Sequence, residues 1–221
     1  MTEGQTLSVK NDPSFSPPVR ISAAIISFVF HPLFVGIYMA AFIIYWDPTL
    51  FLAFSEKGKL LKLLTFVNNN FIFPVLVVLL LKGLGFSRSI LLQSSRERVI
   101  PYSACIIFFF WTWYVFRNQP ETPSELVNMC QGVFFAVSIA FICNSFFKIS
   151  MHAIGVGGLV GLMIILLFNG TMVSGQALAI SLFIAGIVGT ARMINSDHHW
   201  MDLILGFAVG LIGQAIAFWV F

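Results

Sequence analysis

The chain has 221 residues, of which 58% are hydrophobic and only 10% are charged, and its mean hydropathy is +0.93. A soluble domain carries about 25% charged residues, so this composition excludes an ordinary globular domain, and it also excludes a disordered chain or a nucleic-acid-binding module. The net charge of +3 is too small to indicate a polyanionic partner. An integral membrane protein with several spans remains.

The first twenty residues are polar and contain three prolines, and they predict an N-terminal tail. Residues 21–221 then predict one transmembrane domain, because a membrane-spanning helix needs roughly 20 apolar residues and apolar segments of about that length follow one another. The first of them is too long for the apolar core of a signal peptide, so we expect it to be retained. The predicted spans are 21–46, 66–84, 101–116, 125–147, 153–168, 174–194 and 201–221. The fold class is therefore an all-α, polytopic transmembrane bundle of six or seven spans.

Three local patterns refine this prediction. His31-Pro32 lies inside the first apolar segment and predicts a helix kink with a packed or hydrogen-bonded imidazole. Residues 55–64 alternate basic and leucine residues, which predicts a short separate helix lying in the membrane interface. Small residues recur at helical spacing and predict close helix packing; they are Gly155, Gly157, Gly158, Gly161, Gly206 and Gly210.

Charged residues beside the spans gather in three clusters. A charge at the centre of a bilayer costs about 2.5–3.5 kcal/mol, so such clusters favour a functional site. The clusters are residues 94–101 with Arg96 and Arg98 (Arg88 lies upstream), residues 148–153 with Lys148, Ser150 and His152, and residues 192–202 with Arg192, His198, His199 and Asp202. Alternatives remain open for the first, as a positive loop that sets topology, and for the second, as a structural histidine. A plain interfacial loop does not need the two histidines and the aspartate of the third.

The positions of the clusters strengthen the functional interpretation. They follow the second, fourth and sixth predicted spans, and even-numbered spans all end on the face that holds the N-terminus. Three clusters that are distant in sequence are therefore expected to meet on one face of the membrane.

The residue types point to phosphate chemistry. Arginine forms planar, bidentate hydrogen bonds to phosphate oxygens, and the hydroxyl of Ser150 can donate one more. Acidic residues are too few for a carboxylate metal site, so we expect no metal and no other cofactor. Two histidines allow one to attack phosphorus and the other to protonate the leaving oxygen. On a helix, Asp202 would lie on the same face as His198 and could orient its imidazole, although His199 could compete for the carboxylate.

These residues resemble the signatures of the type-2 phosphatidic acid phosphatases. Arg192-x5-His198-x3-Asp202 is similar to the third signature, Ser-Arg-x5-His-x3-Asp, with Ala191 in place of its serine. Ile149-Ser150-Met151-His152 matches the second signature, Pro-Ser-Gly-His, at serine and histidine. The stretch 96–101 loosely resembles the first, Lys-x6-Arg-Pro. The order is that of the family, and the resemblance covers about residues 85–215.

The resemblance implies a helical core of the kind shared by these phosphatases and the haloperoxidases, and it implies a role for each residue. His198 would be the nucleophile, Asp202 its orienting partner and His152 the general acid. Arg192 and Ser150 would bind phosphate, and Arg96 or Arg98 would supply the cation of the first signature. Lys148 is added to the phosphate-binding set because it lies two residues before Ser150.

The predicted function is that of a lipid phosphatase, which hydrolyses a lipid phosphate or pyrophosphate through phosphohistidine without a metal. A lipid phosphotransferase with the same intermediate, and a non-catalytic lipid-phosphate-binding or transport protein with a degenerate site, are the alternatives. The expected partner is the lipid substrate, with no nucleic acid, and the oligomeric state stays open. We expect an integral protein of a bacterial inner membrane. The distribution of Lys and Arg does not decide which side the site faces, since without the proposed site residues it is even.

Overall fold

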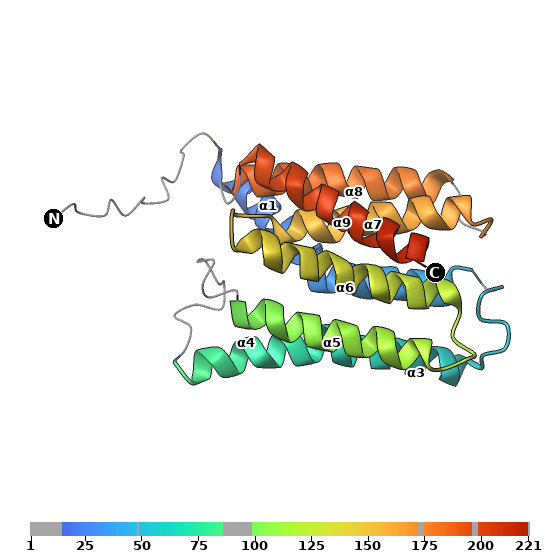
Figure 1. The fold of residues 1–221 in the computed structure, drawn as a ribbon. Helices are drawn as coiled ribbons and strands as arrows, with labels where there is room; N and C mark the ends of the chain where they lie inside the picture. The colour runs from blue at the N-terminus through green and yellow to red at the C-terminus, as the bar shows by residue number, and fades with distance from the viewer. Residues whose placement is uncertain (1–14, 48, 86–98, 172–174, 196–198, 221) are drawn as a thin grey trace.

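The computed structural model describes residues 15–47, 49–85, 99–171, 175–195 and 199–220 of the chain, and the regular elements in these ranges are all helical (Figure 1). In chain order they are α1 (Pro17–Val29), α2 (Pro32–Tyr45), α3 (Glu56–Val67), a π-helical turn η1 (Asn68–Ile72), α4 (Phe73–Gly83), α5 (Val99–Arg117), α6 (Ser124–Asn144), α7 (Met151–Phe168), α8 (Gly175–Ile194) and α9 (Trp200–Val220). The start of α1 at Pro17 falls inside the predicted tail, whose first fourteen residues lie outside the described part.

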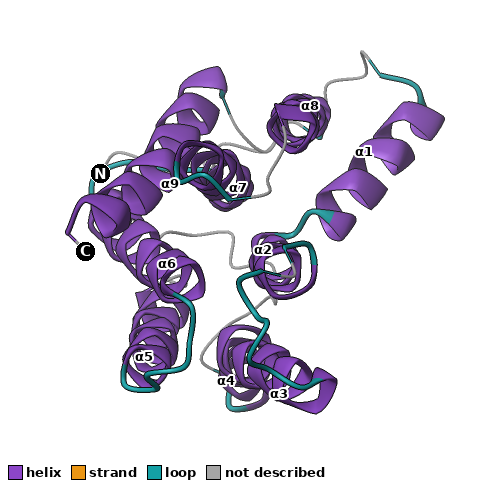
Figure 2. Ribbon diagram, turned by 90° about the vertical axis from the view of Figure 1, so that its right-hand side faces the viewer, coloured by secondary structure: helices purple, strands orange, loops and turns teal. Residues whose placement is uncertain are grey.

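Among the described residues, six helical segments are long and apolar enough to cross a membrane, and the bent pair α1–α2 adds a seventh if it is counted as one span. This confirms the predicted all-helical class and its six or seven spans. The helices lie roughly side by side along one direction, with α1 inclined away from the rest (Figures 1 and 2).

The prediction of a separate interfacial helix over residues 55–64 is wrong. A helix does begin at Glu56, but α3, η1 and α4 form one continuous helix of 28 residues up to Gly83. The wider turn η1 ends two residues before Pro74, which has no N–H to donate and would otherwise interrupt the regular bonding pattern. The buried amide of Asn70 in this turn donates to Phe66 O at 3.1 Å and to Thr112 Oγ1 on α5 at 2.8 Å.

The predicted kink at His31-Pro32 is confirmed, and α1 and α2 meet there at an angle of 52°. Pro32 is at the start of α2, where its missing N–H costs nothing, and His31 caps that helix because its Nδ1 accepts the Leu33 N–H at 3.4 Å. The break leaves main-chain carbonyls at the end of α1 without their usual helical donors. One of them, Val29 O, accepts from the hydroxyl of Tyr38 at 3.0 Å.

Helix α7 packs most extensively on α9, which lies beside it in Figure 2, and it also contacts α8, α2 and α6. Glycines permit the close approach of α7 and α9. A Cβ on Gly157 would overlap the carbonyl oxygen of Phe207, and a Cβ on Gly210 would overlap that of Ile154. The predicted packing of small residues is therefore confirmed at this contact.

The chain direction alternates so that the candidate site residues gather at one end. Figure 1 shows the start of α1, the end of α6, the start of α7, the end of α8 and the start of α9 at its left-hand side, together with the end of α4 and the start of α5. We call this the N-terminal end of the bundle. The predicted gathering of the three clusters at one end is thus confirmed for the helix termini that flank them.

Candidate functional site

The second and third clusters touch each other at the N-terminal end. The main-chain N–H of Ser150 donates to the carbonyl oxygen of Asp202 at 3.2 Å, although the two residues are 52 positions apart. Gly206 makes this possible, because a Cβ there would lie 2.7 Å from Ser150 O. The starts of α7 and α9 are therefore fixed to one another.

Ser150 and Asp202 each also stabilise the start of their own helix. Ser150 is fully buried and is the N-cap of α7, where its Oγ accepts the Ala153 N–H at 3.4 Å. Asp202 is in the first turn of α9, and its Oδ2 accepts the His199 N–H at 3.2 Å. A carboxylate in this position is also favoured by the positive end of the helix dipole. The carboxylate predicted to orient His198 thus holds the main chain at His199, directly before α9.

His152 faces the break in the first span. Its Nε2 lies 3.0 Å from Ser27 O at the end of α1. A carbonyl oxygen can only accept, so Nε2 carries the hydrogen in this contact. The ring also packs edge-on against His31, with ring centroids 5.5 Å apart and an angle of 85° between the planes.

Arg192 points into the bundle rather than toward lipid. It follows Val188 by one helical turn on α8, and Val188 is completely buried in the core. Arg192 is half-buried with its Nε buried, and it lies close enough to His31 for an electrostatic interaction. His152, His31 and Arg192 therefore form one group that combines α7, the break and α8.

The structure brings together Ser150, His152, Arg192 and Asp202 of the predicted set. Lys148 is exposed at the edge of this group, two residues before Ser150. Other predicted residues lie outside the described part of the chain, namely His198 and the cations Arg96 and Arg98, with Arg88 beside them.

Two neighbours of the site were missed from the sequence. His31 was predicted to shape a kink, and Ser27 was not singled out. The signal was present, because Ser27 and His31 are the polar residues spaced four apart in an otherwise apolar stretch directly before a proline. Ser27 is buried, and within the described residues its Oγ has no hydrogen-bond partner.

An apolar groove runs beside this group between α1 and α8. It has a volume of about 260 Å³ and is lined by residues from Pro18 to Ile26 on α1 and from Ile187 to Ile194 on α8. Ile26 is adjacent in sequence to Ser27, and Ala191 is adjacent to Arg192. The groove and the polar group therefore lie on neighbouring faces of the same two helices.

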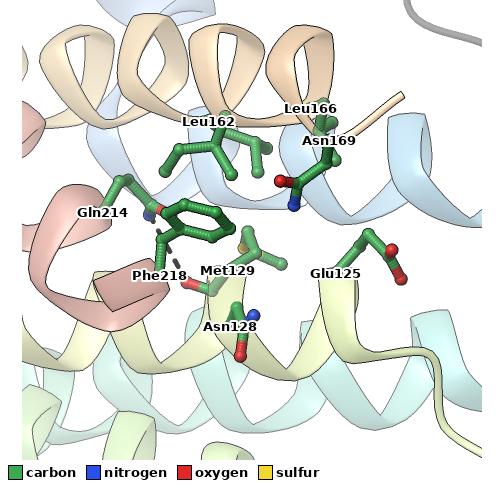
Figure 3. A pocket seen from close by; sticks show the side chains of 9 residues that line it. Glu125, Asn128, Met129, Leu162, Leu166, Asn169, Gln214 and Phe218 are labelled. Carbon is green, nitrogen blue, oxygen red and sulfur yellow. Dashed lines mark hydrogen bonds between the residues drawn. The ribbon is translucent and has the colours of Figure 1, made fainter. Parts of the chain in front are cut away.

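A second hollow lies at the opposite end of the bundle, between α6, α7 and α9 (Figure 3). Its polar side chains include Glu125, Asn128 and Asn169, and Gln214 donates there to Met129 O at 3.4 Å. Its volume of about 10 Å³ is room for about one water molecule, so it does not accommodate a substrate.

Among the described residues, no three His, Cys, Asp or Glu side chains gather as metal ligands would. No protein-family model, no curated protein and no solved structure matches the chain. Any function must therefore be argued from the residues at the N-terminal end.

Proposed function

We propose that the chain is a membrane lipid phosphatase whose active site is the polar group at the N-terminal end of the bundle. The observation that supports this most directly is the hydrogen bond from Ser150 N–H to Asp202 O. It joins the two sequence segments that resemble the second and third signatures of the type-2 phosphatidic acid phosphatases. An active site built from these two signatures requires that the segments lie next to each other.

The electrostatics of this end favour an anion. Arg192 and Lys148 supply positive charge, and Arg192 can form paired hydrogen bonds to phosphate oxygens. The positive ends of the α7 and α9 dipoles also meet here, because Ser150 caps one helix and Asp202 is in the first turn of the other. Arg96 and Arg98 complete the proposed phosphate-binding set.

In the proposed reaction the imidazole of His198 attacks phosphorus, while Asp202 stabilises the charge that the ring gains. The bond from phosphorus to the lipid oxygen breaks as the phosphorus–nitrogen bond forms. His152 gives a proton to the departing oxygen and later accepts one from the water that hydrolyses phosphohistidine. Phosphate leaves, and both histidines return to their starting states without a metal.

A lipid is the substrate class that suits the surroundings. The groove between α1 and α8 is mostly apolar and is lined by Ile26 and Ala191, the residues next to Ser27 and Arg192. A hydrocarbon chain in this groove would keep contact with apolar side chains while its phosphate reached the polar group.

The test is phosphate release by the purified protein in detergent with EDTA, measured on phosphatidic acid, phosphatidylglycerol phosphate, undecaprenyl pyrophosphate and a lipid A phosphate. We expect His198→Ala to lower release from the preferred lipid by at least about 10³-fold, as removal of a nucleophile does. The matched control is His199→Ala, which removes the adjacent histidine, to which the proposed reaction assigns no role, and which should stay within about threefold of the unmodified chain.

Release that requires added metal, or release that His198→Ala leaves intact, would contradict the proposal. Adding an acceptor alcohol to the same assay separates a hydrolase from a phosphotransferase, because the latter would transfer the phosphoryl group to the alcohol.

A non-catalytic lipid-phosphate-binding protein is the second candidate, and one observation favours it. Ser150 Oγ caps its own helix and His152 Nε2 joins α7 to α1, as purely structural side chains would. For such a protein the folded chain would bind lipid phosphates but release no phosphate, and His198→Ala would change only the affinity.

A further inference from the structure

We propose that the break between α1 and α2 positions His152 for the proposed reaction. In this proposal, which rests on the proposed function, the main-chain carbonyl of Ser27 holds the hydrogen on Nε2, so the nitrogen that exchanges a proton with the substrate is Nδ1. His31 and Pro32, which create the break, are then positioning residues for the acid.

The Ser27 carbonyl can accept a hydrogen bond from His152 because the regular hydrogen-bonding pattern of α1 ends early. In an unbroken helix the His31 N–H would donate to Ser27 O, but here it donates to Phe28 O at 3.2 Å. Pro32 has no N–H and cannot supply the donor that Phe28 O would otherwise receive. The shift by one carbonyl leaves Ser27 O facing α7, where His152 donates to it.

The orientation of the ring is fixed from two sides. The contact with Ser27 O fixes Nε2, and His31 packs edge-on against the ring. His31 is itself held, because its Nδ1 accepts the Leu33 N–H. Turning the ring over would therefore cost His152 its hydrogen bond to Ser27 O.

The proton balance follows from this arrangement. When the lipid oxygen departs from phosphorus it takes the proton from Nδ1, and the ring stays behind in its neutral form with hydrogen on Nε2. When water attacks phosphohistidine, Nδ1 accepts the proton that the water loses. Nε2 keeps its hydrogen, and its bond to Ser27 O, throughout the cycle.

The direct test is the histidine tautomer, observed by nitrogen NMR of the 15N-histidine-labelled chain in detergent. The His152 signal is assigned by its absence from His152→Gln. We expect neutral His152 to carry hydrogen on Nε2 and no hydrogen on Nδ1. A neutral ring with hydrogen on Nδ1 would overturn the proposal.

The second test is Pro32→Ala, which restores an N–H at position 32 and lets the His31 N–H return to Ser27 O. We expect this variant to lose the Nε2–H signature and to lower kcat/KM for a lipid phosphate by about 10²-fold, the usual contribution of a general acid. For p-nitrophenyl phosphate, whose leaving group needs no proton, we expect a change of less than about threefold.

The control is Pro74→Ala on α4, which also removes a proline from a span. It should leave kcat/KM unchanged for both the lipid phosphate and p-nitrophenyl phosphate. If Pro32→Ala keeps the tautomer and the activity, Pro32 does not free the carbonyl and the proposal fails. Equal losses on both substrates would also contradict it, because loss of the proton donor should spare a leaving group that needs no proton. If the unmodified chain hydrolyses neither substrate while His198→Ala still binds lipid, the proposed function fails instead.

Discussion

A single side chain, His152, serves both the fold and the proposed chemistry. Its hydrogen bond to Ser27 O is 3.0 Å long and satisfies a carbonyl that the helix break exposes. A main-chain carbonyl left without a donor in an apolar surrounding costs about 1–3 kcal/mol. The same contact orients the imidazole that we assign as the acid. Loss of activity on replacing His152 therefore does not by itself separate the two roles.

Two replacements separate them. His152→Gln keeps a side-chain N–H near the position of Nε2, whereas His152→Ala removes it. We expect the glutamine variant to unfold in denaturing detergent within about 0.5 kcal/mol of the unmodified chain and the alanine variant to lose about 1–3 kcal/mol. Both variants should lose release of lipid phosphate. A glutamine variant that stays active would mean that His152 only supports the break.

At this scale the sequence predicted which residues matter but not all of their contacts. Ser150, His152, Arg192 and Asp202 were predicted from residue type and spacing, and the structure brings them together. The contact between His31 and His152 was not predicted, because residues more than a hundred positions apart leave no periodic trace of one another. The sequence analysis did not predict that Ser150 and Asp202 stabilise helix starts, because it assigned both residues to the site from their resemblance to phosphatase signatures.

Among the elements, the contact of α7 with α9 places the two halves of the site. A Cβ on Gly210 would overlap Ile154 O, and one on Gly206 would lie 2.9 Å from the Ala153 side chain. Because the contact is between main chains, neither helix has a flexible side chain that could move aside. The distance between the starts of α7 and α9 is therefore set by the absence of side chains.

Gly210→Ala should separate the two helices. We expect it to lower the free energy of unfolding by about 1–3 kcal/mol, as overpacking does, and to weaken phosphate release along with stability. The control is Gly186→Ala on α8, where a Cβ would meet nothing within 4 Å. That variant should be neutral or gain up to about 1 kcal/mol from the better helix propensity of alanine. Equal stability of the two variants would argue against the contact.

The helices were predictable from the sequence where their signals were local. Long apolar runs placed α5 to α9 within a few residues, and His31-Pro32 placed the kink. The prediction failed at residues 55–64, where the alternation of basic and leucine residues indicated a short interfacial helix separate from the following span. No glycine or proline interrupts residues 59–73, so the chain continues through η1 instead.

For the whole molecule, the gathering of the polar group at one end predicts which turns lie on the same face of the membrane as the candidate site. An odd number of crossings separates the turn after α6 from the turn after α7, so these turns should lie on opposite faces of the membrane. The charge distribution gave no orientation because the arginines and lysines of the proposed site would accumulate there for chemical reasons, whatever the topology.

Labelling of single cysteines tests this arrangement. In a variant without Cys105, Cys130 and Cys143, exposed Ser145 and Asn169 are replaced one at a time by cysteine. A membrane-impermeant maleimide added to sealed vesicles should label only one of the two, and opening the vesicles should make the other reactive. Labelling of both from the same side would refute a crossing by α7. The labelled side identifies the face on which the site lies.

The close contact of α7 with α9 also has a consequence for biogenesis. Because α7 precedes α9 in the chain, the glycine face of α7 must wait beside lipid or other helices until α9 is inserted. The hydrogen bond between Ser150 and Asp202 can form only after that moment. Nascent chains that stop before α9 would therefore lack this contact and leave the glycine face of α7 uncovered.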